Sequence, residues 1–202
     1  METSVFIPWV PLRRRLRMLI VRTSVLLITN ALLAGCSTRT TRFVITDHRA
    51  AGPTQRYSES FDEGYYAVDD HGNVDVVLRR ESRAPDSPHE SIVQVVHLRT
   101  VWKSVPGETV AHRSQINASV TYSIVTGRVG ARFEGAGSLF FRLDTRRGML
   151  HGVLESASLR PKGKKAGADD LFRDAEMEGE FTARHEPRWA YRILHETNRE
   201  FE

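Results

Sequence analysis

The sequence predicts a mainly β protein: a single antiparallel meander of about seven or eight strands, forming a barrel or a sandwich, with a helix at its C-terminal end. Two segments, 116–124 and 175–183, alternate apolar and polar residues over nine positions. A period of two is typical of a strand that buries one face. Turn-forming residues fall between such segments, as expected for strands joined by hairpins.

Shorter segments carry the same signal. Residues 92–102 form a run rich in β-branched residues, and 43–45 is expected to be a short strand. Weaker alternation occurs in four further segments: 74–78, 129–133, 139–143 and 150–154. Glycine-containing turns are expected between the strands at five places: 70–73, 106–107, 126–127, 135–137 and 147–148.

The C-terminal segment changes period. Pro187 suits the first turn of a helix. The residues after it that recur at helical spacing, and so share one side, are Trp189, Ala190, Ile193, Leu194, Thr197 and Phe201. We therefore expect a helix that packs on the sheet.

The charge of the chain is unevenly distributed. The 202 residues include 29 Lys and Arg and 25 Asp and Glu, for a formal net charge of +4. Five arginines and one acid, Glu2, lie in residues 1–35, which leaves 24 residues of each sign from Cys36 onward. A formally neutral folded part lacks the net basic face that displaces counterions from nucleic acids, so no nucleic-acid partner is expected.

Residues 1–35 have the order of a secretory signal peptide: arginines, an apolar run, then small residues. The apolar run covers about 13 residues, from Thr23 to Gly35, which is shorter than the roughly 20 needed to span a bilayer as a helix. Met18 begins a leader of more usual length than Met1 does, and either start leaves this run intact.

The four residues Leu33-Ala34-Gly35-Cys36 match the lipobox at every position, and Cys36 is the chain's only cysteine. Through residues 13–37 the chain thus resembles bacterial lipoproteins. The resemblance implies cleavage before Cys36, a diacylglyceryl group on its sulfur and acylation of the new N-terminus. Leu33, Ala34 and Gly35 are then the cleavage motif. Two or three acyl chains hold a protein firmly on a membrane, whereas one binds only marginally.

The resemblance also implies a location and an order of parts. Ser37, rather than Asp, follows the cysteine, which favours the outer membrane, facing the periplasm, in organisms that have one. Residues 36–60 are rich in Ser, Thr, Arg and Gly, and we expect a lipidated N-terminus and a flexible tether there. Residues 61–202 are expected to form the β-rich domain, whose partner is an envelope protein, a lipid or the cell wall.

Side chains suited to catalysis or metal binding are scattered. The eight histidines occur singly, and neither a Gly-x-Ser-x-Gly motif nor a glycine-rich phosphate loop is present. Pairing of their strands could bring His97 and His151 together, but surface or hydrogen-bonded histidines are expected. Glu176, Glu178 and Glu180 are expected to form a solvated strand face, and 161–167 a basic loop. No catalytic residue, metal site, cofactor or ligand site is assigned.

Three functions remain open. The first is a non-catalytic binding or scaffolding domain on a membrane-anchored lipoprotein of the cell envelope. Gly64-Tyr65-Tyr66 resembles the Gly-x-Trp start of lipocalins, with tyrosine for tryptophan, which implies as an alternative a carrier of a small apolar ligand. A third is an envelope enzyme of unrecognised type, which requires a cleft with convergent polar side chains. A filled barrel favours scaffolding and a hollow one favours a carrier.

Overall fold

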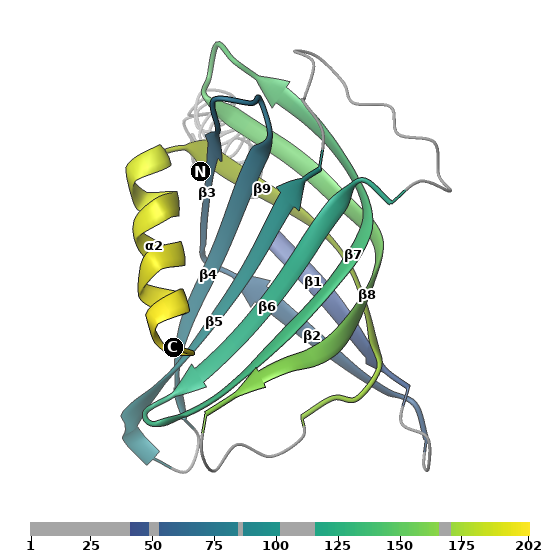
Figure 1. The fold of residues 1–202 in the computed structure, drawn as a ribbon, viewed down its shortest axis with the longest axis vertical. Coiled ribbons are helices and arrows are strands. Elements are labelled where there is room, and N and C mark those ends of the chain that lie inside the picture. The colour runs from purple at the N-terminus through teal and green to yellow at the C-terminus, as the bar shows by residue number, and fades with distance from the viewer. Residues whose placement is uncertain (1–40, 49–52, 85–86, 102–115, 166–170) are drawn as a thin grey trace, which may run out of the picture. The chain divides into compact units, whose positions relative to one another are not determined.

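The computed structural model describes residues 41–48, 53–84, 87–101, 116–165 and 171–202. These residues contain nine strands and one helix (Figure 1). In chain order they are β1 (Thr41–Asp47), β2 (Gln55–Phe61), β3 (Glu63–Val68), β4 (Val74–Ala84), β5 (Ser87–Thr100), β6 (Ala118–Thr126), β7 (Val129–Asp144), β8 (Met149–Lys164), β9 (Ala175–His185) and α2 (Pro187–Arg199).

Seven of the strands, β3 to β9, form a closed barrel. Each pairs antiparallel with the next along the chain, and β9 closes the ring on β3. The closing pair is parallel, with Tyr65 beside Arg184 and Tyr66 beside His185, and so departs from a purely antiparallel meander. The predicted mainly β barrel with a C-terminal helix is confirmed.

The strands β1 and β2 correct the expected boundary of the domain. They lie within 36–60, where a flexible tether with one short strand was expected, and β1 pairs antiparallel with both β2 and β9. Phe43 and Ile45 of β1 are buried in the core. The polar composition of β2 conceals its alternation, since Tyr57 and Phe61 on one face of the strand pack into the core. The strand domain therefore begins at Thr41 rather than at residue 61.

A single long strand replaces two expected short ones. Residues 129–133 and 139–143 both belong to β7, and the turn expected at 135–137 between them is wrong. Here glycine serves close strand packing: a Cβ on Gly135 would lie 1.6 Å from the carbonyl oxygen of Ser158 on β8, and one on Gly137 would lie 2.3 Å from that of Ser156. Three other expected turns have glycines with positive φ, at Gly72, Gly127 and Gly148. The turn expected at 106–107 lies outside the described residues.

The basic segment 161–167 also differs from expectation. β8 continues through Lys164, so the first part of this segment is strand rather than loop. Lys162 forms an ion pair with Glu134 at 3.8 Å, and Lys165 pairs with Glu200 after α2.

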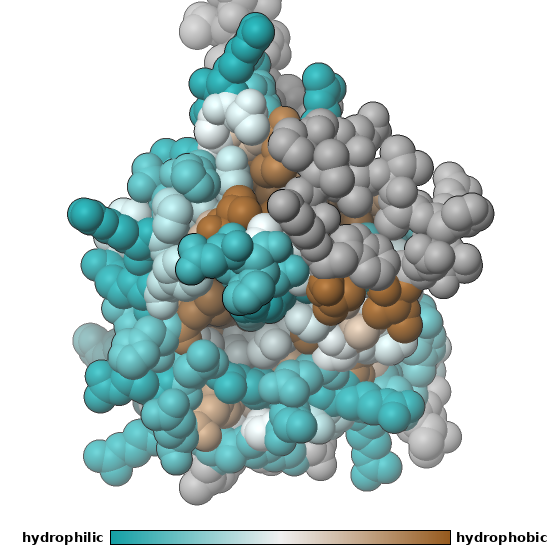
Figure 2. Space-filling model, turned by 45° about the horizontal axis from the view of Figure 1, so that its top comes forward, coloured by the Kyte–Doolittle hydropathy of each residue, from teal (hydrophilic) through white to brown (hydrophobic). Residues whose placement is uncertain are grey.

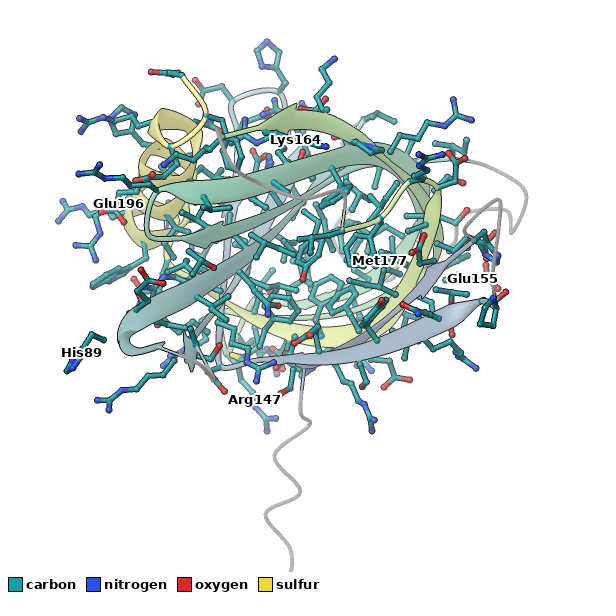
Figure 3. All side chains as sticks on the ribbon, turned by 90° about the horizontal axis from the view of Figure 1, so that it is seen from below. His89, Arg147, Glu155, Lys164, Met177 and Glu196 are labelled. Atoms are coloured by element: carbon teal, nitrogen blue, oxygen red, sulfur yellow. The ribbon has the colours of Figure 1, made fainter. Side chains whose placement is uncertain are left out.

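Side chains fill the interior of the barrel. Viewed from below, they point inward from all around the ring, Met177 among them, whereas Glu155 and Glu196 point outward (Figure 3). The buried apolar residues inside form one continuous cluster that includes the buried aromatic rings of Phe43, Phe61, Tyr66, Tyr122, Phe133, Phe141, Phe172 and Phe181. The ring of Phe172, just before β9, has its centroid 6.4 Å from that of Tyr122 and 5.0 Å from that of Phe133.

The helix α2 packs on the outside of the barrel. Pro187 occupies its first turn, as expected, and Ala190 and Ile193 are buried. Together with Ala67, Val77 and Val95 they form a second, smaller apolar cluster over β3, β4 and β5. Arg132 of β7 holds the end of the helix by donating to the carbonyl of Thr197 and to Oδ1 of Asn198, at 3.2 and 2.9 Å.

Candidate functional site

The lipid-attachment motif lies outside the described residues. Leu33, Ala34, Gly35 and Cys36 all precede Thr41, where the description begins. Lipidation of Cys36 therefore stays a prediction from the sequence. The first described strand, β1, begins at Thr41, five residues after Cys36.

The strands of His97 and His151 do not pair, so these two histidines do not come together. His97 lies on β5 opposite Thr121, whereas His151 lies on β8 opposite Thr182. β6 and β7 separate these strands in the sheet, so no change of register brings the two histidines together. In the part of the chain that the structure describes, no three His, Cys, Asp or Glu side chains are grouped so as to hold a metal ion.

His97 belongs instead to a polar cluster on β4 and β5. Its Nε2 lies 2.8 Å from Oδ1 of Asp75, a carboxylate that is 1% exposed. Nη1 of Arg99 lies 3.4 Å from both oxygens of the same carboxylate, and its Nη2 donates to Asp69 at 2.7 Å. Alternation did not single out Asp75, because it lies inside the apolar run 74–78 and its partners are more than 20 residues away.

This cluster fastens the turn between β3 and β4 to β5. The Asp69 carboxylate accepts from the side chain and the backbone N–H of Asn73 and from the N–H of His71. These bonds, with the nearby charge of Arg99, lower the pKa of Asp69. Among the described residues, the side chain of His97 forms a hydrogen bond with the carboxylate of Asp75 and with no hydroxyl group. This contact joins β4 to β5 and is structural.

A second polar group lies inside the barrel. The hydroxyl of Tyr122 donates to Oε1 of Gln94 at 3.0 Å, and both residues are buried. Glu59 of β2 and Arg80 of β4 form an ion pair nearby. Burial and the negative charge of Glu59 raise the pKa of Tyr122, so its phenol stays protonated and remains a donor.

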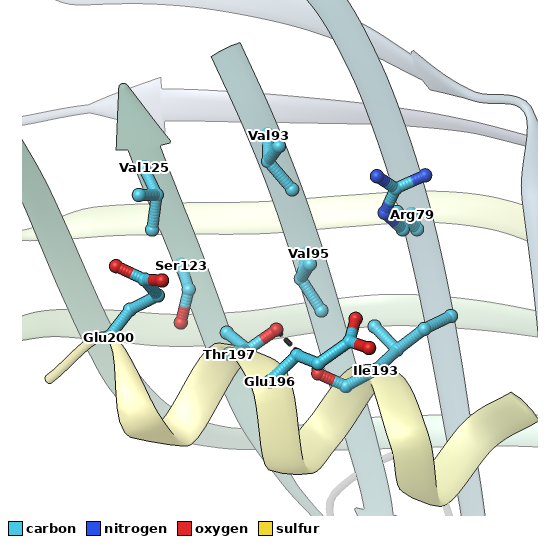
Figure 4. Close-up of a pocket in the computed structure, with 9 residues that line it drawn as sticks. All are labelled: Arg79, Val93, Val95, Ser123, Val125, Ile193, Glu196, Thr197 and Glu200. Atoms are coloured by element: carbon cyan, nitrogen blue, oxygen red, sulfur yellow. Dashed lines mark hydrogen bonds between the residues drawn. The ribbon is translucent and has the colours of Figure 1, made fainter. Parts of the chain in front are cut away.

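A small pocket lies between α2 and the outer face of the barrel (Figure 4). Its volume is about 180 Å³. Valines of β5 and β6 form its base, α2 forms one wall, and the complete lining is Arg79, Val93, Val95, Ser123, Val125, Ile193, Glu196, Thr197 and Glu200. Pockets for drug-sized ligands begin at about 300 Å³, so this one fits only a small apolar group.

The charged rim of this pocket is already paired. Burial opposes the charge of Arg79, but its contacts with Glu81 and Glu63 outweigh that effect and raise the pKa of Arg79. The ion pairs at the rim are Arg79 with Glu63 and Glu81, Glu196 with Arg192, and Glu200 with Lys165. The rim therefore presents balanced charge to a ligand.

A shallow, open groove crosses the outer face of β1, β9 and β8. It has a volume of about 480 Å³. Val44 and Val153 form its apolar part, Arg42 lies at one side, and Glu178 and Glu180 line it from β9. The expectation that the glutamates of β9 face solvent is confirmed, since all three are exposed.

Exposed hydrophobic residues also occur at the upper end of the barrel as drawn. In the space-filling view, hydrophobic residues gather in the middle of a largely hydrophilic face (Figure 2). Val101, at the end of β5, is 57% exposed, and Ile116, just before β6, is 64% exposed. These residues flank 102–115, which lies outside the described chain.

Comparison with known proteins assigns no family to this chain. No helix among the described residues has both the length and the apolar character needed to cross a membrane. The chain matches no family model, no curated protein and no solved structure.

Proposed function

We propose that this protein is a lipoprotein of the bacterial cell envelope, held on a membrane by acyl chains on Cys36, and that its barrel binds or scaffolds without catalysing a reaction. The observation that carries the proposal is the four-residue lipobox, with the only cysteine of the chain at the acceptor position. The small residues Ala34 and Gly35 before it suit cleavage by a protease working close to the membrane.

The described part of the fold is compatible with cleavage at this motif. Cleavage before Cys36 leaves β1 complete, including Phe43 and Ile45, which belong to the core.

The packing of the interior favours a scaffold over a lipocalin-like carrier. A carrier needs room for its ligand, and the barrel interior holds a continuous cluster of buried side chains instead. Tyr66, at the position of the lipocalin-like tryptophan, points into this cluster and is 4% exposed. Its ring lies 5.0 Å from that of His185.

The surface pockets favour binding over catalysis. A catalytic cleft brings together polar side chains that are not already committed to one another. The pocket under α2 has a charged rim engaged in ion pairs, and the groove over β1, β8 and β9 is shallow and open.

The lipid anchor is tested by replacing the acceptor. Cys36→Ser is expected to abolish acylation and to move the protein out of the membrane fraction or to leave it as uncleaved precursor. Mass spectrometry of the N-terminal peptide measures this directly, with Ser37→Ala as a control that keeps the cysteine. An identical acylated peptide from Cys36→Ser would refute the proposal. Ser37→Asp is expected to keep the acyl chains and to change the membrane in which the protein is recovered, in a cell with two membranes.

The carrier alternative has its own test. Titration of the purified acylated protein with a fluorescent fatty acid is expected to show no saturable site. Saturable binding that an unlabelled fatty acid displaces, and that Met177→Trp inside the barrel abolishes, would assign the barrel to transport instead.

A further inference from the structure

The position of β1 determines where the chain leaves the barrel. The ladder between β1 and β9 ends at Arg42, opposite Glu180. In the residue before it, Oγ1 of Thr41 accepts from the backbone N–H of Thr182 at 3.2 Å. Two residues later, at Arg184, β9 pairs with β3 instead. The approach of β3 is close, since a Cβ on Gly64 would lie 2.3 Å from the carbonyl oxygen of Thr182. Thr41, the first described residue, therefore lies at a fork in the side wall of the barrel.

The distance from this fork to a lipidated Cys36 is short. Five residue steps separate Cys36 from Thr41, and an extended chain covers at most about 3.6 Å per step, or about 18 Å in all. Neighbouring strands lie about 4.8 Å apart, so the outer faces of β8 and β7 are roughly 5 and 10 Å from β9. A lipid on Cys36 is therefore tied within about 18 Å of the fork.

The outer wall of β7, β8 and β9 is divided by charge near the fork. Arg142, His151 and Thr182 lie in one cross-strand row, and Arg184 lies in the next, beside Met149. Arg142 and Arg184 are exposed. The turn between β7 and β8 adds Arg146 and Arg147, of which Arg147 lies 3.8 Å from Asp144. The half of the wall toward this turn is therefore mainly basic.

The other half of the same wall is mainly acidic. Glu176, Glu178 and Glu180 are exposed along β9, and Glu155 is exposed on β8. Arg160 and Lys162 of β8 are also exposed there, and they pair with Asp174 and Glu134. Arg56 pairs with Glu178 there, at 3.2 Å. Anionic lipid headgroups attract clustered arginines and repel clustered carboxylates within about one Debye length, roughly 8–10 Å at physiological salt.

From the short anchor and the divided charge we propose that the outer wall of β7, β8 and β9, on the side of Arg142 and Arg184, is a membrane-contact surface for anionic lipid headgroups. This inference rests on the proposed lipidation of Cys36 and adds to it the face that the barrel turns to the bilayer. The acidic half of the wall then tilts away from the lipid, and the groove beside Val153 opens along the membrane edge.

The only cysteine of the chain makes a sharp experiment possible. Once Cys36 is acylated, a single introduced cysteine is the only free thiol. Three exposed outward positions are compared: Val153→Cys on β8, two residues from His151, Ser158→Cys on the same strand opposite Glu176, and Ser119→Cys on β6. The full-length mature protein is reconstituted in vesicles of phosphatidylcholine and phosphatidylglycerol, and its reaction with a membrane-impermeant maleimide is timed against the same protein in neutral detergent.

We expect the Val153→Cys thiol to react at least fivefold more slowly on vesicles than in detergent, the Ser158→Cys thiol to be slowed less, and the Ser119→Cys thiol to be unchanged. Reversal of two charges, Arg142→Glu with Arg184→Glu, is expected to restore fast reaction at Val153→Cys. The matched control, Arg83→Glu with Arg128→Glu, makes the same change in net charge at exposed positions on β4 and after β6 and is expected to have no effect.

The outcomes separate this inference from the function on which it rests. Equal slowing at Val153→Cys and Ser119→Cys, or slowing that survives the Arg142 and Arg184 reversal, would overturn the membrane-contact surface while acylation stands. Slowing in detergent that grows with protein concentration would assign the wall to a second copy of the chain and would also overturn it. Mass spectrometry that finds no acyl chains on Cys36 would remove both proposals.

Discussion

Gly152 on β8 lies directly opposite Phe181 on β9, and a Cβ at Gly152 would come within 2.2 Å of the tip of the Phe181 ring. The same arrangement recurs between β9 and β1, where Gly179 lies opposite Phe43. A Cβ on Gly179 would be 2.7 Å from the Phe43 ring. The two rings are stacked, with centroids 6.1 Å apart. Because each glycine has no side chain, an aromatic ring of the neighbouring strand can lie flat against the sheet at that position.

The first prediction tests this space. Gly152→Ala is expected to lower the free energy of unfolding by about 1–3 kcal/mol, the usual cost of overpacking a core. Gly163→Ala, in the same strand, is the control, because a Cβ there would meet no atom closer than 3.8 Å. Urea denaturation compares the two. Combining Gly152→Ala with Phe181→Leu is expected to recover part of the loss, and full additivity of the two changes would contradict a shared space.

The second prediction tests the register of β9. Phe181 is 3% exposed, so Phe181→Ala is expected to cost about 3–5 kcal/mol through the cavity that it leaves. Glu180 is the adjacent residue and is exposed, so Glu180→Ala is expected to cost less than about 0.5 kcal/mol. Typical domains have a total stability of about 5–15 kcal/mol, so the first change approaches unfolding. Urea melts that show equal losses for the two variants would place β9 in the wrong register.

Alternation predicted the strands well wherever one face is apolar and the other polar. In β9, Met177 and Phe181 are buried and Glu178 is exposed, as the period of two requires. The same reasoning missed β2 because the polar residues Gln55 and Glu59 share its inward face with Tyr57 and Phe61, and pairing with β1 defines the strand. It also divided β7 in two, because glycine reads as a turn residue from sequence while here it admits a neighbouring backbone.

The polar sites could not be predicted, because they depend on which strands become neighbours. Asp75 meets His97 only through the pairing of β4 with β5, and Glu59 meets Arg80 only because β2 returns alongside the barrel. The local sequence does not indicate which distant strands will become neighbours. The pocket under α2 likewise needs the docking of a helix against strands that precede it by about 70–110 residues. By contrast, the lipobox is a contiguous motif and is readable without a fold.

The third prediction concerns residues 116 and 117, just before β6, where the expected alternation is reversed. Ile116 was expected inside and Asn117 outside, but Asn117 is 1% exposed and Ile116 is 64% exposed. The Asn117 side chain accepts from the N–H of Leu139 and donates to its carbonyl, each at 2.7 Å, and so continues the ladder to β7.

Asn117→Ala is therefore expected to cost about 2–4 kcal/mol, because it leaves a buried N–H and a buried C=O of Leu139 without partners. Ser119→Ala, at an exposed neighbouring position, is the control and is expected to cost less than about 0.5 kcal/mol. Hydrogen exchange gives a local readout, since the amide of Leu139 is expected to lose protection in Asn117→Ala. Unchanged exchange at Leu139 would show that water or a rearranged strand takes over the role of the amide.

The last prediction is a pH dependence that belongs to Tyr122. Its buried phenol has a raised pKa, whereas a tyrosine in the unfolded chain titrates near its usual value of about 10. Below that pH both states keep the proton, and the contribution of Tyr122 to stability is fully present. Above it the unfolded state loses a proton that the folded state retains, so stability falls as pH rises, by up to about 1.4 kcal/mol per pH unit.

Tyr122→Phe removes this titration. Near neutral pH it is expected to cost about 1–2 kcal/mol, through the hydrogen bond lost by Gln94. Between about pH 10 and pH 11 the free energy of unfolding of Tyr122→Phe is expected to decline less steeply than that of the unchanged chain. The difference between the two slopes is up to about 1.4 kcal/mol per pH unit, which corresponds to one proton. Tyr65 and Tyr66, whose pKa values are also raised by burial, titrate alike in both proteins and cancel in the comparison. Urea melts at a series of pH values measure the two slopes, and parallel curves would mean that Tyr122 ionises in the folded protein as readily as in the unfolded chain.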